Sequence, residues 1–105
     1  MSAVKEQLEG IIADNNIVLF MKGDPHQPRC GFSAKTVQAL IDCEAQFSYV
    51  DILENNDVRA TLPSLSDWPT FPQVFIDGEL IGGADIVTQM HEAGELKTMI
   101  DNSSE

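Results

Sequence analysis

A run of five consecutive apolar residues constrains the fold of this chain more than any other segment. It spans residues 17–21 and reads Ile17-Val18-Leu19-Phe20-Met21. A short, unbroken apolar run predicts a strand that is buried on both faces, because a strand with one solvent face would alternate apolar and polar residues. Such a strand needs other elements to cover both sides of its sheet. We therefore expect a sheet with helices on each face.

Apolar residues at helical spacing supply the covering helices. The predicted helical segments are 3–15, about 31–44, 57–62 and one that begins near 84–85. We expect Pro63 to end the third of these helices, because proline has no N–H group to donate. Gly94 interrupts the last helix, and one or two further helical turns follow it. Residues 101–105 are expected to form a frayed tail.

Three further segments have the patterns of strands. Residues 47–51 alternate apolar and polar side chains, and residues 73–77 and 79–81 flank the pair Asp77-Gly78. Asp-Gly between two short strands is a strong signal for a hairpin. The prolines within residues 64–72 exclude regular structure there.

The element order α-β-α-β-α-β-β-α predicts how the strands are arranged. The first two strands are joined by a helix, so we expect them to be parallel with a right-handed crossover. The last two form an antiparallel hairpin. The fold class is therefore α/β, with a four-stranded mixed sheet flanked by helices, which is the arrangement of the thioredoxin fold. A length of 105 residues predicts a single domain over residues 1–105.

The formal charge of −11 bears on what the chain can bind. An acidic chain repels a phosphate backbone, so we expect no nucleic-acid partner. No apolar run approaches the roughly 20 residues of a membrane helix, and no signal peptide is visible, so a cytoplasmic location is expected. Three of the six basic residues, Lys22, Arg29 and Lys35, flank Cys30 in sequence. This clustering indicates a small anionic ligand, unless it arose by chance.

Cys30 stands where a polar loop enters the second predicted helix. Backbone N–H groups and the helix dipole stabilise a thiolate at such a position, which lowers the pKa of the thiol. Cys43 lies at the other end of the same helix, roughly 15–20 Å away at the helical rise per residue. A disulfide needs Cα atoms within about 7 Å, so the two cannot pair within one chain. We expect Cys43 to be a buried core residue.

An activated thiol has two broad roles, thiol–disulfide exchange and metal binding. Position 33 is Ser33, which cannot resolve a mixed disulfide, so an external thiol such as glutathione would have to release it. An iron–sulfur cluster needs four ligands, which two chains and two glutathione thiolates would complete. His26 and His91 are weak candidates for zinc ligands. A cysteine hydrolase is disfavoured because neither histidine has an obvious partner.

Four short motifs, in order, resemble those of one known family, the CGFS-type monothiol glutaredoxins. The motifs are Met21-Lys22-Gly23, Cys30-Gly31-Phe32-Ser33, Trp68-Pro69-Thr70-Phe71-Pro72-Gln73 and Gly82-Gly83-x-Asp85. The resemblance covers roughly residues 3–100 and is greatest to the single-domain bacterial members. It implies a thioredoxin fold, glutathione binding, and a glutathione-ligated [2Fe–2S] cluster that bridges a homodimer. It also implies a role in cluster biogenesis, storage and transfer, with BolA-type proteins and scaffold and acceptor apoproteins as partners.

The resemblance also implies roles for individual residues. Cys30 matches the cluster ligand and reactive thiol. The glutathione-binding positions implied are Lys22, Arg59, Phe71, Pro72, Gly83, Ala84 and Asp85. Within these, Phe71 precedes a proline that is cis in the family, and Asp85 is expected to receive the ligand ammonium, to cap the helix, or both. Many relatives have cysteine where this chain has Ala84, which removes a possible second thiol.

Three functions therefore remain open at this point. The first is an iron–sulfur carrier, and the alternative is a glutathione-dependent thiol–disulfide oxidoreductase acting by a monothiol route. A weaker third is a regulatory adaptor that docks partners whatever its cluster state. We assign no chemistry to Trp68 and expect Phe32 to serve packing.

Overall fold

The computed structural model describes residues 3–103 and contains a four-stranded mixed sheet. Its strands lie in the order β2-β1-β3-β4. The central strand β1 is parallel to β2 and antiparallel to β3, and β3 pairs with β4 as an antiparallel hairpin. The strands are β1 Ile17–Met21, β2 Ser48–Asp51, β3 Gln73–Ile76 and β4 Glu79–Gly82. The sheet predicted from the sequence is confirmed.

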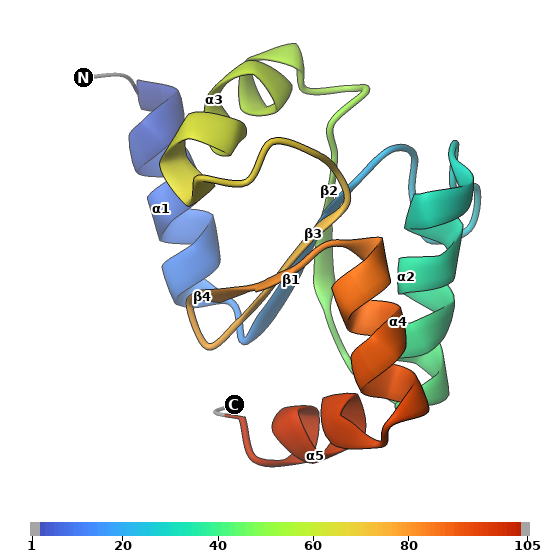
Figure 1. The fold of residues 1–105 in the computed structure, drawn as a ribbon. Helices are drawn as coiled ribbons and strands as arrows, with labels where there is room; N and C mark the ends of the chain where they lie inside the picture. The colour runs from blue at the N-terminus through green and yellow to red at the C-terminus, as the bar shows by residue number, and fades with distance from the viewer. Residues whose placement is uncertain (1–2, 104–105) are drawn as a thin grey trace.

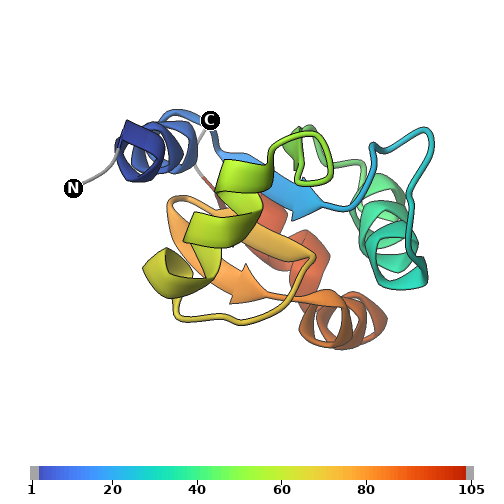
Figure 2. The ribbon, with the colours of Figure 1, turned by 90° about the horizontal axis from the view of Figure 1, so that it is seen from above.

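Helices cover both faces of this sheet. They are α1 Ala3–Asp14, α2 Gly31–Asp42, α3 Asn56–Ser66, α4 Ala84–Glu92 and α5 Glu95–Asp101. Helices α1 and α3 pack together on one side of the sheet, and α2 and α4 pack together on the other (Figure 1). Figure 2 shows the same separation from above.

The central strand separates two hydrophobic clusters. Ile17, Leu19 and Met21 belong to the cluster that includes residues of α2, α4 and α5. Val18 and Phe20 belong to the cluster that includes residues of α1 and α3. All five residues of β1 are buried, as the unbroken apolar run predicted. The sheet is thus held by packing on both faces, and the loops at its ends are free to form a site.

Helix α3 departs from the prediction. Pro63 lies inside it, and the helix continues to Ser66 before Asp67 adopts a left-handed conformation with φ 57°. The expectation that Pro63 would end the helix is wrong. Burial favours the extra turn, because Leu65 packs against the cluster beneath α1 and α3. The carbonyl of Pro63 also accepts a hydrogen bond from the N–H of Trp68 at 3.2 Å.

The chain stays ordered further towards its C-terminus than the sequence predicted. Asp101 is the last residue of α5 rather than the start of a tail. The Ser103 hydroxyl donates to the Ile100 carbonyl at 2.6 Å and accepts from the Asn16 side chain at 2.9 Å. Residues 104–105 of the expected tail lie outside the described residues.

Candidate functional site

Cys30 is the N-cap residue of α2. Its backbone is extended, with φ −151° and ψ 154°, and its sulfur accepts the N–H of Ser33 at 3.4 Å. An N-cap side chain ordinarily satisfies one of the free N–H groups in the first helical turn, and here a sulfur does so. The thiol is half-buried. The predicted placement of a thiol where a loop enters a helix is confirmed.

The surroundings of Cys30 favour its thiolate. Burial alone raises the pKa of this thiol, because a charged sulfur is poorly solvated. Hydrogen bonds from the Ser33 hydroxyl and from the backbone of Ser33 and Phe32, together with the charge of Lys22, act in the opposite direction. The net result is that the pKa of Cys30 is lowered. A larger fraction of the thiol is therefore ionised near neutral pH.

Ser33 is fully buried and connects Cys30 to the end of β1. Its hydroxyl oxygen accepts the backbone N–H of Lys22 at 3.1 Å and lies 3.5 Å from the sulfur of Cys30. In the sequence, Ser33 was notable only as a missing second thiol. The structure shows that it also holds Lys22 beside Cys30. The N-cap position of Cys30 was the signal for this role, since it directs the sulfur towards residue 33.

Two further hydrogen bonds fix the loop that follows β1. The N–H of Gly23 donates to the Asp51 carboxylate at 2.9 Å, and the N–H of Arg29 donates to the Lys22 carbonyl at 2.8 Å. Gly23 has φ 91°, and a Cβ at this residue would lie 2.5 Å from the Gln27 carbonyl oxygen. Glycine is therefore required for the loop to fold back on itself.

A groove of about 710 Å³ lies beside these residues. Its walls come from the end of β1, the start of α2, α3, the loop before β3, and the start of α4. The lining residues are Lys22, Phe32, Arg59, Pro63, Trp68, Pro69, Thr70, Phe71, Pro72, Gly83, Ala84, Asp85 and Ile86. All seven residues predicted for glutathione binding are among them. Cys30 does not line the groove, but its neighbours Lys22 and Phe32 do.

The charges around Cys30 differ from the sequence-based expectation. Of the three cations near it in sequence, Lys22 lines the groove whereas Arg29 lines a different hollow that also contains Asp24 and Glu54. Lys35 is exposed and lines neither. The second cation of the groove is Arg59, from α3. Segments distant in sequence therefore supply the positive charge.

Two aromatic residues of the groove were missed. Phe32 is 59% exposed and lines the groove, so the expectation that it serves packing is wrong. Trp68, to which we assigned no chemistry, also lines it. The indole ring of Trp68 lies against Gly83, because a Cβ at Gly83 would be 3.3 Å from the indole nitrogen. Phe32 lines the groove because it is exposed, and Trp68 lines it because of how its loop packs. Neither property produces a periodic pattern in the sequence.

The start of α4 and the loop before β3 meet within the groove. The peptide bond between Phe71 and Pro72 is cis, as the resemblance implied. The N-cap of α4 is Gly83, so the alternative in which Asp85 caps this helix is wrong. Asp85 is instead an exposed residue of the first turn and lines the groove. Its carboxylate is therefore accessible to a ligand.

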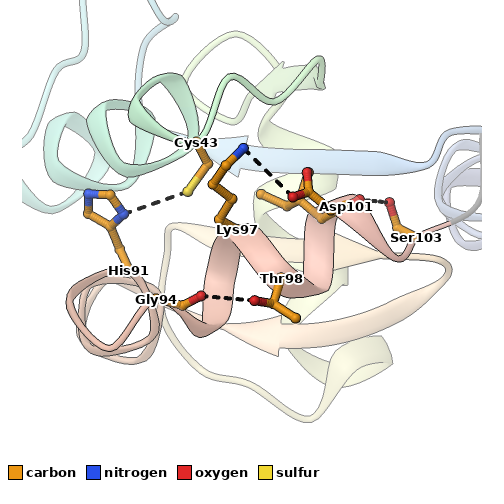
Figure 3. Close-up of polar contacts among 8 residues, drawn as sticks. Cys43, His91, Gly94, Lys97, Thr98, Asp101 and Ser103 are labelled. Carbon is orange, nitrogen blue, oxygen red and sulfur yellow. Dashed lines mark hydrogen bonds and ion pairs between the residues drawn. The ribbon is translucent and has the colours of Figure 1, made fainter.

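The second thiol, Cys43, is 3% exposed and lies at the C-terminal end of α2, as predicted. Its sulfur is 3.6 Å from Nδ1 of His91 (Figure 3), and Nε2 of His91 is 3.5 Å from the Asp42 carboxylate. The expectation that neither histidine has a partner is therefore wrong for His91. Burial raises the pKa of Cys43, which opposes a role as a nucleophile.

Within residues 3–103, no three histidine, cysteine, aspartate or glutamate side chains are grouped so that they could hold a metal ion. Cys43 and His91 are therefore not part of such a group.

Comparison with known proteins assigns the family. A family model described as Glutaredoxin matches residues 17–81. The chain belongs to the glutaredoxin family. It is similar to "Glutaredoxin 4" of Escherichia coli (strain K12), with 53% identity over 99% of this chain and 90% of that protein. With Ser33 three residues after Cys30, it is a monothiol glutaredoxin, as the resemblance implied.

Solved structures agree with this assignment. The solution structure of reduced poplar apo GrxS14 has 44% identity and a TM-score of 0.81, over 94% of this chain and 91% of that one. A buckwheat glutaredoxin–glutathione complex has a TM-score of 0.81 at 24% identity, over 93% and 87% of the two chains, and shows the fold alone. The thioredoxin fold is confirmed for this glutaredoxin. None of its helices within residues 3–103 is long and apolar enough to cross a membrane.

Proposed function

We propose that this monothiol glutaredoxin binds glutathione in the groove and carries a [2Fe–2S] cluster between two copies of the chain. The cluster is its cargo in iron–sulfur biogenesis, storage and transfer. One observation carries the proposal. Cys30 has a lowered pKa and lies next to Lys22 and Phe32, which line the groove, while Cys43 is buried at the far end of α2. A lone activated thiol suits shared ligation better than self-contained redox cycling.

The groove suits the chemistry of glutathione. This tripeptide has two carboxylates and one ammonium group, and the groove offers Lys22 and Arg59 to the former and Asp85 to the latter. The N-terminus of α4, at Gly83 and Ala84, adds free N–H groups for a carboxylate. The backbone of Phe71, ahead of Pro72, is available for pairing with an extended peptide.

Cys30 fits the donor set that a [2Fe–2S] cluster needs. Such a cluster is held by four ligands, most often thiolates. Each chain offers Cys30, and a glutathione bound in the adjacent groove would offer a second thiolate. Two chains and two glutathiones complete the set. The homodimer in this proposal is therefore held by its cargo, and BolA-type proteins and scaffold and acceptor apoproteins, in the cytoplasm, are the proposed exchange partners.

Anaerobic reconstitution with iron, sulfide and glutathione tests this proposal. We expect visible charge-transfer absorption and a shift from monomer to dimer on size-exclusion chromatography. Cys30→Ser should abolish both signals, whereas Cys43→Ser should largely retain them. A colourless, monomeric wild-type chain would refute the carrier function. Equal loss in both variants would contradict the assignment of ligation to Cys30 alone.

The alternative function, glutathione-dependent reduction of mixed disulfides, uses the same thiol and groove. The lowered pKa of Cys30 favours it as well, because the thiolate is the attacking species. A turnover assay with a small glutathione mixed disulfide separates the two functions. Rapid turnover by a chain that fails to take up a cluster would favour the oxidoreductase.

A further inference from the structure

Gln73 is a fully buried polar residue at the start of β3. Its exposed fraction is 0%, although the rest of β3 is apolar. The side-chain N–H groups donate to the carbonyl of Trp68 at 2.9 Å and to the carbonyl of Thr70 at 3.1 Å. Its Oε1 is buried and has no hydrogen-bond partner in the described structure. The donors, rather than the acceptor, are thus the part of this amide that the fold uses.

Both carbonyls belong to the loop that forms one wall of the groove. Trp68, Pro69 and Thr70 all line it. Two prolines in and beside this loop have no N–H group, so the loop has few backbone donors with which to hold itself. Gln73 supplies the missing donors from a rigid element, because β3 pairs with the central strand and Gln73 is opposite Phe20.

Trp68, which is held by Gln73, also contacts α3 and the start of α4. Its N–H donates to the carbonyl of Pro63 at 3.2 Å, and its own carbonyl accepts from Gln73. Its indole ring lies against Gly83, the N-cap of α4. The backbone of Trp68 is therefore held from both directions, and the ring is pressed against the helix N-terminus proposed to receive glutathione.

We propose that Gln73 is a positioning residue for glutathione. It does not line the groove. It acts through Trp68, by fixing the loop at the width that lets Gly83 and Arg59 engage one ligand together. This inference rests on the proposed binding of glutathione to the groove. A wall fixed before the ligand arrives lowers the entropy lost on binding, so loosening it should weaken affinity.

Gln73→Met tests this role, because methionine has a similar length but no donor. The matched control is Gln89→Met, at an exposed position of α4. The dissociation constant for reduced glutathione is measured by calorimetry or NMR titration, far below the thermal midpoint of each variant. We expect Kd to rise about tenfold in Gln73→Met, a change of about 1.4 kcal/mol, and to stay unchanged in the control.

Trp68 provides a second readout, because it is the single tryptophan of the chain. In Gln73→Met its fluorescence should shift to longer wavelength and become easier to quench with acrylamide, as the loop opens to water. A residue that merely stabilised the fold would lower the free energy of unfolding without changing Kd or the emission of the folded state. This difference separates positioning from general stability.

Gln73→Glu gives a second variant if the methionine variant does not fold, because a protonated glutamate leaves this buried position uncharged and restores one donor. A carboxylate has no donor and would face two carbonyls, so the loss of affinity and the shift in emission should exceed those of Gln73→Met. Protonation at low pH restores one donor and should partly reverse the emission shift. Wild-type affinity with unchanged emission in a folded Gln73 variant would overturn the inference. Failure of the wild-type chain to bind glutathione would instead overturn the proposed function on which it rests.

Discussion

Replacing Ser33 with alanine should affect both the reactive thiol and the stability of the chain. The substitution removes one hydroxyl from a fully buried position. That hydroxyl accepts the N–H of Lys22 at 3.1 Å and lies 3.5 Å from the sulfur of Cys30. A buried donor left without a partner costs about 1–3 kcal/mol. We therefore expect the free energy of unfolding of Ser33→Ala to fall by about this amount in urea titrations.

The same substitution should raise the pKa of Cys30. Burial of this thiol already raises its pKa, and the Ser33 hydroxyl is the largest of the contributions that lower it. The rate of alkylation by iodoacetamide, measured against pH, reports the thiolate fraction. We expect the profile of Ser33→Ala to move to higher pH. Ser64→Ala is the matched control, because the hydroxyl of Ser64 is exposed and donates only to the nearby Thr61 carbonyl.

The pH dependence of stability gives an independent check with a defined sign. The folded-state pKa of Cys30 lies below that of an unfolded cysteine, so the unfolded state binds more protons between the two values. This thiol therefore contributes stability above the unfolded pKa, of about 8.5, and the contribution is lost as pH falls through the folded pKa. Burial raises the pKa of Cys43, so the contribution of Cys43 to stability changes with pH in the opposite direction, but this contribution is the same in wild type and in Ser33→Ala. Hence the difference between wild type and Ser33→Ala isolates Cys30.

An alkylation profile of Ser33→Ala that coincides with that of wild type would refute the effect of Ser33 on the pKa of Cys30. An equal loss of stability in the two chains, as the pH is lowered through the titration of Cys30, would refute it as well. A stability change as small as that of Ser64→Ala would show that the Lys22 N–H finds another partner.

Three further predictions concern the scaffold. Gly23→Ala should lower the free energy of unfolding, measured by chemical denaturation, by about 2–4 kcal/mol, because Gly23 has φ 91° and a Cβ there would clash with backbone atoms. The control, Gly10→Ala, has open space around it in α1 and should raise the free energy of unfolding by about 0.5–1 kcal/mol. Equal effects of the two substitutions would contradict this prediction. Phe20→Ala should lower the free energy of unfolding by about 3–5 kcal/mol in the same measurement, since Phe20 is fully buried and packs edge-to-face on Phe75 with ring centroids 5.7 Å apart. A loss below about 1 kcal/mol would show that this face of the sheet is not tightly packed. A disulfide reagent should modify Cys30 of the folded chain rapidly but Cys43 only on unfolding, because Cys43 is buried and burial raises its pKa. Rapid modification of both thiols in the folded chain would contradict this assignment.

The sequence predicted the architecture well wherever one physical signal dominated. The five apolar residues of β1 are buried on both faces, and the Asp77-Gly78 pair forms the turn with positive φ at both residues. The signal failed at Pro63, where burial of Leu65 beyond the proline outweighs the lost hydrogen bond. Local propensity therefore determined the elements, but tertiary packing determined where α3 ends.

The candidate site was predictable to the extent that it is built from short motifs. The motif residues Phe71, Pro72, Gly83 and Asp85 line the groove together with Arg59. The supporting contacts were not predictable, because they join residues far apart in sequence or depend on exposure. The pair Cys43 and His91, 48 residues apart, is one example, and the contact of Trp68 with Gly83 is another. No spacing rule relates such residues before the chain has folded.

The antiparallel pairing of β1 with β3 has a consequence for folding. One side of the groove, with Lys22, directly follows β1, and the other, with Phe71, Pro72, Gly83 and Asp85, comes from the segments on either side of the β3–β4 hairpin. No fragment of the chain therefore carries a complete groove, and the groove forms only after a contact of long sequence separation has closed. A ligand that contacts both sides binds only the chain in which this contact has formed, and it therefore stabilises the folded state. At a concentration one hundred times its Kd, such a ligand would add about 2.7 kcal/mol to the free energy of unfolding, so glutathione, if it binds the groove as proposed above, would also help to keep the chain folded.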